Sequence, residues 1–185
     1  MKPRPAVFLD RDGVINVFPG DGHYVLSWAE FRFMPRVREN LARLKKAGFA
    51  LVLVTSQRCV GRGLMTQATL DEIHARMQAE LGSERLDAIY CCPHHPDEDC
   101  PCHKPEPWMI RQAAREHGLD LARSFVIGDS GRDIAMGRAA GCRTALCRQN
   151  LPRPEDVPPE KRADRMFATL DEAVDWVLSA SGFPL

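Results

Sequence analysis

Two carboxylates, Asp10 and Asp12, follow the short apolar run Ala6-Val-Phe-Leu9 and precede Gly13. If this run is a buried strand, it places both acids at its carboxyl end, because alternate side chains of an extended chain project to the same side. One carboxylate of such a pair can attack phosphorus while the other passes a proton to the leaving oxygen and later activates water. The pair therefore indicates transfer of a phosphoryl group.

A second apolar run, Phe49 to Val54, stops at Thr55 and Ser56, which offer a hydroxyl and backbone amides to phosphate oxygens. Lys104 offers a positive charge to offset the negative charge of a phosphoryl transition state. Each feature alone has an ordinary alternative, since a Thr-Ser pair often caps a helix and a lone lysine is usually solvated. Together, and in this order, they favour a phosphate site.

A further apolar run, Ser124 to Ile127, leads into Gly128 and Asp129. Magnesium is a hard cation that prefers carboxylate oxygens and water, so Asp129 could join Asp10 around a magnesium ion. Asp133 follows one helical turn later and is placed to hold Lys104. The sequence therefore predicts a catalytic Mg²⁺ beside the carboxylate pair.

A cysteine- and histidine-rich stretch at about residues 91–103 has the spacing of a metal site. Cys92-Pro-His94 and Cys100-Pro-Cys102 can close a tetrahedron of N and S ligands around Zn²⁺ with no open position, which is typical of a structural site. Cys91 and His95 are alternative ligands, and a loop of free thiols is the alternative to a metal. The stretch leads directly into Lys104, so a structural Zn²⁺ would fix the backbone that presents this lysine.

The elements that must position these residues follow from the apolar pattern. Short apolar strands alternate with amphipathic helices, which predicts a three-layer α/β fold with a central parallel sheet covered on both faces. In such sheets, sites form beyond the carboxyl ends of the strands. We expect strands at 6–9, 49–54, 86–90, 124–127 and 143–146, helices near 37–47, 67–81, 108–117, 133–140 and 170–178, and a loop at 151–160.

Length and composition limit the class of protein. The chain has 185 residues, of which 44% are hydrophobic and 27% charged, and we expect one domain over residues 1–185. Its 25 basic and 25 acidic residues give no net charge, which argues against a nucleic-acid partner. The sequence shows neither a signal-peptide core nor an apolar run of membrane-spanning length. We therefore expect a cytoplasmic monomer with no membrane partner.

Four segments resemble the four motifs of haloacid-dehalogenase (HAD) superfamily phosphatases: FLDRDGVIN at 8–16, VTSQ at 54–57, HKPEP at 103–107 and GDSGRD at 128–133. The resemblance implies the Rossmann-like HAD fold without a separate cap domain, and a Mg²⁺-dependent phosphatase that forms a phospho-aspartate. Asp10 would be the nucleophile and Asp12 the general acid and base. The resemblance places Mg²⁺ on Asp10, the Asp12 backbone carbonyl and Asp129. It assigns phosphate and substrate contacts to Thr55, Ser56, Gln57, Lys104 and Asp133.

Within that superfamily the zinc loop is similar to those of two bacterial groups, which act on D-glycero-D-manno-heptose 1,7-bisphosphate, a lipopolysaccharide precursor, and on histidinol phosphate. The segments Gly22 to Val25 and Gly61 to Gly63 favour the heptose group, with Arg62 reaching an anionic sugar phosphate. His103 stands where these groups have an arginine that contacts the distal part of the substrate. The chain also departs from the family pattern at three other positions: Ser56, Arg58 and Trp108.

These departures leave other functions open. Another phosphorylated sugar is one alternative substrate. A catalytically silent zinc-loop binding module and a nucleic-acid end phosphatase are alternatives of a different kind. A silent module is disfavoured because the chain retains Lys104 and all four acidic motif residues, Asp10, Asp12, Asp129 and Asp133. The zero net charge argues against a nucleic-acid substrate.

Overall fold

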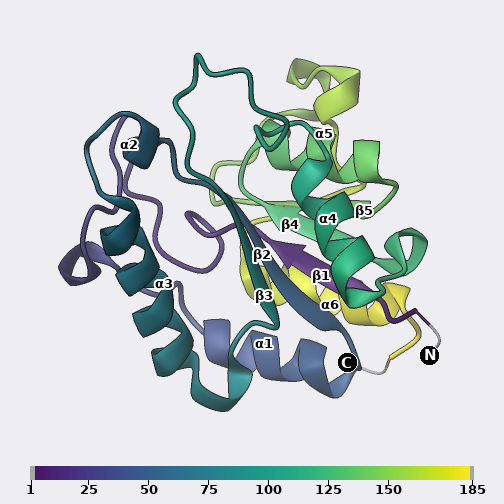
Figure 1. The fold of residues 1–185 in the computed structure, drawn as a ribbon. Coiled ribbons are helices and arrows are strands. Elements are labelled where there is room, and N and C mark those ends of the chain that lie inside the picture. The colour runs from purple at the N-terminus through teal and green to yellow at the C-terminus, as the bar shows by residue number, and fades with distance from the viewer. Residues whose placement is uncertain (1–2, 184–185) are drawn as a thin grey trace.

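Six parallel strands form one sheet in the computed structural model, which describes residues 3–183 (Figure 1). The sheet order is β3-β2-β1-β4-β5-β6. The strands are β1 (Ala6–Leu9), β2 (Ala50–Ser56), β3 (Ala88–Cys92), β4 (Phe125–Gly128), β5 (Arg143–Cys147) and β6 (Arg165–Phe167). The chain first builds outward from β1 through β2 to β3 and then returns to β1's other side with β4. A crevice for ligands therefore opens at the carboxyl ends of β1 and β4.

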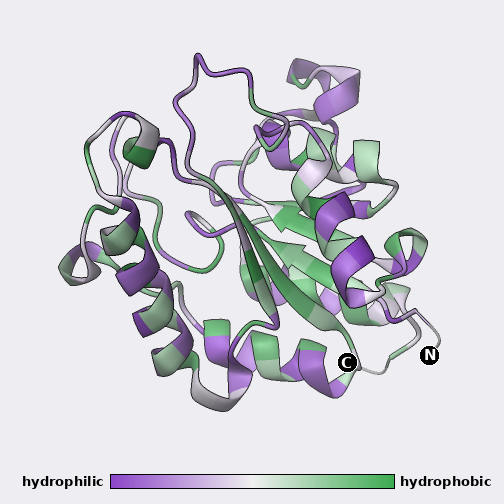
Figure 2. Cartoon of the chain, viewed as in Figure 1, coloured by the Kyte–Doolittle hydropathy of each residue, from purple (hydrophilic) through white to green (hydrophobic). Residues whose placement is uncertain are grey.

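Helices cover both faces of the sheet. The helices are α1 (Val37–Lys46), α2 (Arg58–Gly61), α3 (Gln67–Leu81), α4 (Trp108–His117), α5 (Gly131–Ala140) and α6 (Leu170–Ala180). Buried side chains of α1, α3 and α6 pack on one face, and those of α4 and α5 pack on the other. Side chains of β1 pack against both helix layers. Val7 and Leu9 face α1, α3 and α6, whereas Ala6 and Phe8 face α4 and α5. Figure 2 shows the hydrophobic strands between helices whose outer faces are hydrophilic.

The three-layer fold and all five expected strands are present. Helix ends have local causes: Thr66 caps α3 by accepting a hydrogen bond from the Thr69 amide at 3.1 Å, and Gly118 ends α4 with φ of +61°. The prediction missed α2 and β6, which have four and three residues, too few to show a period. The predicted loop at 151–160 contains a 3₁₀ turn at Pro154–Asp156 and the start of another at Pro159–Lys161.

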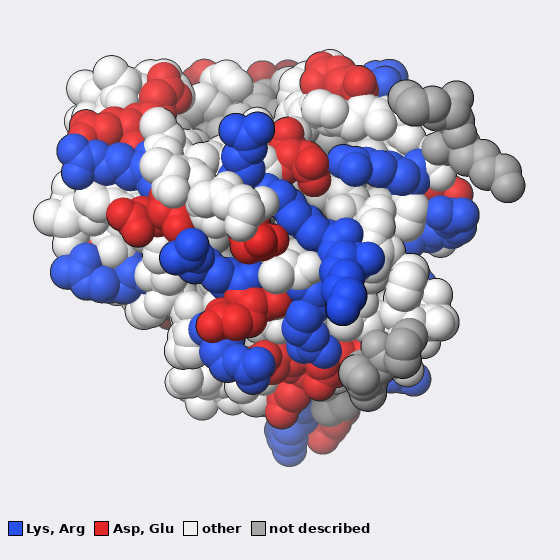
Figure 3. Space-filling model, turned by 90° about the horizontal axis from the view of Figure 1, so that it is seen from below, with Lys and Arg blue, Asp and Glu red and all other residues white. Residues whose placement is uncertain are grey.

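The connections that follow β1 and β3, residues 10–36 and 93–107, contain little regular secondary structure. Between β1 and α1 the chain forms only a 3₁₀ turn, Trp28–Glu30, and between β3 and α4 it forms no helix or strand, as expected without a separate cap domain. On the face seen in Figure 3, basic and acidic side chains are interspersed rather than gathered by sign. Within residues 3–183, the helices are too short or too polar to cross a lipid bilayer.

Candidate active site

Asp10 and Lys104 form the centre of a polar cluster at the carboxyl ends of the strands. Asp10 directly follows β1, and its amide donates to the Ile127 carbonyl of β4 at 3.0 Å, which fixes it at the crevice. Lys104 Nζ lies 2.8 Å from Oδ1 of Asp10 and 2.6 Å from Oδ1 of Asp133. Burial would lower the pKa of Lys104, but the two carboxylates outweigh it and raise this pKa above its ordinary value.

Asp133 is held as firmly as the lysine it contacts. It lies in the first turn of α5, where its Oδ2 accepts hydrogen bonds from the Ser130 amide at 3.1 Å and the Ser130 hydroxyl at 2.6 Å. Gly128 makes this approach possible, because a Cβ at that position would lie 2.2 Å from the Asp133 Cβ. The side chain is 1% exposed, so Lys104 and the helix start fix its position.

Asp129 completes a set of carboxylates whose chemistry fits a divalent cation. Oxygens of Asp10, Asp129 and Asp133 lie within 4.8 Å of one another. Burial, partly offset by Lys104, raises the pKa of Asp10 to about 6. Burial together with Asp10 and Asp133 raises the pKa of Asp129 to about 7. Three acids sharing one lysine leave excess negative charge, and clustered carboxylate oxygens are the donors that Mg²⁺ prefers.

Asp12 is surrounded by a separate set of hydrogen-bond donors. Its Oδ1 accepts from Asn16 Nδ2 at 2.9 Å, and its Oδ2 accepts from Gln57 Nε2 at 2.8 Å. Arg11 Nη2 lies 3.1 Å from both oxygens. Gln57 Nε2 also donates to Thr55 Oγ1 at 2.9 Å, so the residues after β1 and β2 are joined through this amide. The carboxylate of Asp12 is therefore oriented from three sides.

A cavity of about 230 Å³ lies over these acids. Its lining includes seven residues that the sequence analysis named as site residues: Asp10, Asp12, Ser56, Arg62, Lys104, Asp129 and Asp133. Thr55, Gln57 and His103 are not part of the lining, and the first two are buried beneath it.

Two further arginines at this cavity, Arg58 and Arg132, were not predicted as site residues. They come from α2 and α5, and neither forms an ion pair within residues 3–183. Burial, then the charges of Arg132 and Arg62, lower the pKa of Arg58, and its buried Nε has no hydrogen-bond partner in the part of the chain that the structure describes. Two arginines that line a cavity without an ion-pair partner among the described residues favour an anionic ligand there.

The predicted zinc ligands come together as a second cluster. His94 Nδ1 lies 2.9 Å from Cys100 Sγ, 3.3 Å from Cys102 Sγ and 3.7 Å from Cys92 Sγ. Three sulfurs and one imidazole nitrogen at these spacings match the donor set of a closed tetrahedral metal site. His95 is turned away, since its Nδ1 accepts from the Asp97 amide at 3.2 Å.

The cysteine- and histidine-rich loop at about residues 91–103 contacts the active site through backbone hydrogen bonds. The Gln57 amide donates to the Cys92 carbonyl at 2.8 Å, and the Gly61 amide donates to the Pro93 carbonyl at 2.8 Å. A Cβ on Gly61 would lie 2.2 Å from the backbone nitrogen of His95, so α2 packs directly on the loop. The loop thus contacts the chain that follows β2 and leads two residues later from Cys102 to Lys104.

Comparison with known proteins decides the family. A protein from Helicobacter pylori strain J99, D-glycero-beta-D-manno-heptose-1,7-bisphosphate 7-phosphatase, is 36% identical over 93% of this chain and 96% of its own length. The chain belongs to the HAD-like phosphatase family. A protein of the same name from Yersinia pestis is 38% identical over 95% of this chain and 90% of its own length. A family model described as HAD-hydrolase-like matches residues 101–173.

A solved structure supports the same assignment of this HAD-like phosphatase. The D,D-heptose 1,7-bisphosphate phosphatase of B. bronchiseptica, complexed with magnesium and phosphate, superimposes with a TM-score of 0.82 at 34% identity, covering 95% of this chain and 99% of that one. The expected HAD fold and phosphoric monoester hydrolase class are therefore confirmed.

Sequence reasoning missed several residues of this HAD-like phosphatase site. Arg11 and His74 contact each other at 3.4 Å behind Asp12, and both are buried. Arg11 carried a signal, because it lies between the two acids, whereas His74 sits on the buried face of α3 where a core residue is expected. Arg132 lies inside the fourth motif, but that motif alone does not show that the residue lines the cavity. The structure places it there from the first turn of α5.

Proposed function

We propose that this protein is a Mg²⁺-dependent phosphatase that hydrolyses a small phosphorylated sugar through a phospho-aspartate on Asp10. The observation that carries the proposal is the buried contact of Lys104 with Asp10 and Asp133, beside Asp129 and beneath a cavity. This arrangement supplies a nucleophile, a cation for the phosphoryl oxygens and carboxylates for a metal in one place.

In the first step, a carboxylate oxygen of Asp10 attacks phosphorus as the bond from phosphorus to the ester oxygen breaks. Asp12 gives its proton to that oxygen, so the products are an alcohol and an aspartyl phosphate. In the second step, Asp12 takes a proton from water, the water oxygen attacks phosphorus, and the bond to Asp10 breaks. Inorganic phosphate leaves and Asp10 is restored. Lys104 donates to phosphoryl oxygens in both steps.

Metal ions have two assigned places. Mg²⁺ would be held by Asp10, Asp129 and the backbone carbonyl of Asp12. It would supply positive charge to offset the negative charge of the phosphoryl oxygens. The Cys92, His94, Cys100 and Cys102 cluster would hold a structural Zn²⁺. Its closed donor set leaves no position for a substrate, and its proposed role is to hold the loop that presents Lys104.

The substrate we assign is D-glycero-D-manno-heptose 1,7-bisphosphate, with hydrolysis at the 7-phosphate. The printed names of the relatives and the arginines at the cavity mouth support this choice. Asp10 would receive one phosphate while Arg58, Arg62 and Arg132 face the second. Gln57 and Thr55 would support the phosphate site from beneath rather than contact the sugar. His103, outside the cavity lining, would act on the distal part of the substrate only through the loop it belongs to.

The test compares kcat/KM for the heptose 1,7-bisphosphate, heptose 7-phosphate and histidinol phosphate with Mg²⁺ present. We expect the bisphosphate to be preferred, the preference over the monophosphate to shrink by about tenfold in Arg58→Ser or Arg132→Ser, and activity to vanish in Asp10→Asn. Preference for histidinol phosphate or another sugar phosphate would replace the substrate while keeping the chemistry. Absence of Mg²⁺-dependent phosphate release from these substrates and from an aryl phosphate would reject the proposed function.

A further inference from the structure

Arg11 is the largest fully buried side chain of the described chain, and it carries a charge. Its backbone carbonyl accepts hydrogen bonds from the Ile15 amide at 2.8 Å and the Asn16 amide at 2.9 Å, which closes the turn after β1. The guanidinium is 0% exposed, whereas Asp12 is 21% exposed toward the cavity. A buried arginine needs acceptors, because it cannot lose its proton in a protein.

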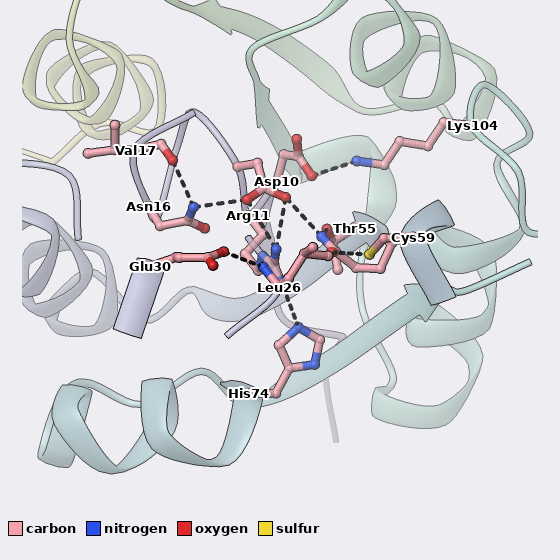
Figure 4. A network of polar contacts seen from close by, with 12 residues as sticks. Asp10, Arg11, Asn16, Val17, Leu26, Glu30, Thr55, Cys59, His74 and Lys104 are labelled. Atoms are coloured by element: carbon pink, nitrogen blue, oxygen red, sulfur yellow. Dashed lines mark hydrogen bonds and ion pairs between the residues drawn. The ribbon is translucent and has the colours of Figure 1, made fainter. Parts of the chain in front are cut away.

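The guanidinium finds two acceptors, one on each side. Nη2 lies 3.1 Å from both carboxylate oxygens of Asp12, and Nη1 lies 3.4 Å from Nε2 of His74. Arginine has no lone pair to accept a hydrogen bond, so His74 Nε2 is the acceptor and the ring proton is on Nδ1. His74 comes from α3, on the face of the sheet opposite α4 and α5, and Figure 4 shows its ring pointing at Arg11.

The neutral form of His74 is the form that its surroundings favour. The residue is 7% exposed, and its burial followed by the charge of Arg11 lowers its pKa to about 4. A neutral ring keeps the acceptor lone pair aimed at Arg11, whereas a protonated ring would oppose it. The proposed mechanism gives no role to Arg11 or His74, although both lie behind Asp12, the proposed general acid and base.

We propose that His74 is a positioning residue that acts through Arg11 to hold Asp12 in the orientation from which it protonates the leaving oxygen. This inference rests on the role given to Asp12 in the proposed function. Among the described residues, Asn16 and Gln57 each donate to one oxygen of Asp12, whereas Nη2 of Arg11 lies within hydrogen-bond distance of both, so the position of both oxygens depends on the guanidinium. Within residues 3–183, His74 is the only other side chain that forms a hydrogen bond with the guanidinium.

A positioning role differs from a structural one in how it depends on the leaving group. An alkoxide leaving from a sugar phosphate needs a proton from Asp12, whereas p-nitrophenolate leaves without one. Misplacement of Asp12 should therefore lower kcat/KM for the sugar phosphate and spare that for p-nitrophenyl phosphate, because kcat/KM reports the steps up to formation of the aspartyl phosphate. Loss of folded protein would lower both values equally.

The experiment measures kcat/KM of the full chain with Mg²⁺ for the sugar phosphate and for p-nitrophenyl phosphate. His74→Leu removes the acceptor and should lower the first value by about 30- to 100-fold and the second by no more than about threefold. His74→Gln keeps an acceptor oxygen and should therefore retain most of the kcat/KM of the unmodified protein for the sugar phosphate. Ile73→Ala, a neighbouring core change in α3, should lower the melting temperature without changing the ratio of the two values.

An unchanged ratio in His74→Leu, or a His74→Gln variant with as low a ratio as His74→Leu, would overturn the inference. If His74→Leu does not fold, His74→Met takes its place, because its unbranched side chain adapts to the cavity without offering a strong acceptor. Asp12→Asn separates this failure from that of the proposed function. If Asp12→Asn retains hydrolysis of the sugar phosphate, the proposed function is wrong, whereas loss in Asp12→Asn with an unchanged ratio in His74→Leu rejects only the role of His74.

Discussion

The ammonium group of Lys104 lies 2.8 Å from Oδ1 of Asp10, although 94 residues separate them in the sequence. The Lys104 side chain is 4% exposed and that of Asp10 is 13% exposed, so this charged contact is largely shielded from water. A phosphoryl group attacked by Asp10 must therefore come within reach of Lys104. Further expectations follow from how this pair is held.

Removal of the Lys104 charge should abolish most of the activity. Lys104→Met leaves Asp10, Asp129 and Asp133 without the cation they share, and removes a donor to the phosphoryl oxygens. We expect kcat for p-nitrophenyl phosphate to fall by about 10³-fold. Lys46→Met changes an exposed lysine of α1 and serves as the control. Activity in Lys104→Met within tenfold of the unmodified protein would contradict the assignment.

Asp133 should matter for both stability and rate. Asp133→Asn weakens the charged hydrogen bonds to Lys104 and Ser130, and we expect it to lower the free energy of unfolding by about 2 kcal/mol and kcat by about 10²-fold. The matched control is Thr169→Ala, which removes the N-cap of α6. It should lower the free energy of unfolding by about 1 kcal/mol and should not affect kcat. Urea unfolding and steady-state kinetics measure both. Equal kcat values in the two variants would exclude a role for Asp133 at the site.

Gly128 should not tolerate even one added methyl group. A Cβ there would lie 2.2 Å from the Asp133 Cβ, so Gly128→Ala must displace the start of α5, and we expect a loss of about 1–3 kcal/mol together with most of the activity. At Gly131 an added Cβ would lie 3.0 Å from Lys161 Cδ and 3.1 Å from Lys161 Cβ, so only a small shift of this residue is needed. Gly131→Ala should therefore cost much less stability and activity than Gly128→Ala. The prediction fails if the two variants have similar melting temperatures and rates.

The cysteine and histidine cluster should bind one zinc ion per chain. We expect elemental analysis to find one equivalent of Zn²⁺ in the purified protein and in Cys91→Ser, which alters a cysteine outside the cluster. Cys100→Ser should lose the metal and melt at a lower temperature, because three donors no longer close the site. Retention of a full equivalent in Cys100→Ser would show that the ligands are others.

Acid should destabilise the protein through His74. Its pKa is lowered from 6.5 to about 4 in the folded protein, chiefly by burial and then by Arg11, so the unfolded chain binds more protons in this range. Stability is therefore fully present above pH 6.5 and falls as the pH drops toward 4, by about 2 kcal/mol between pH 8 and pH 5. Urea unfolding of the unmodified protein and His74→Gln at both pH values tests this. Parallel losses in the two proteins would contradict it.

Much of the fold was predictable because its signals are local. The strand Ala6–Leu9 is apolar throughout and ends at an acid, and Thr66 and Gly118 mark helix ends by their own side-chain and backbone preferences. The cluster of three cysteines and one histidine was predictable from spacing alone, and in the structure the ring of His94, not that of His95, lies beside the sulfurs.

The unpredicted parts depend on distant contacts. β6 has three residues and forms a strand only because β5 offers it an edge. His74 looks like a core position of α3, and its contact with Arg11 arises because that helix packs beside the turn that follows β1. Arg58 and Arg132 meet at one cavity from two helices that are far apart in sequence. No local pattern reports such meetings.

The most direct test of the account is the site of covalent phosphorylation. The protein is mixed with substrate and Mg²⁺, quenched in acid during turnover and treated with borohydride, which reduces an aspartyl phosphate to homoserine. The account predicts that mass spectrometry finds homoserine at position 10, and that Asp10→Asn shows neither homoserine nor phosphate release. Homoserine at another acidic residue, or continued phosphate release by Asp10→Asn, would contradict it.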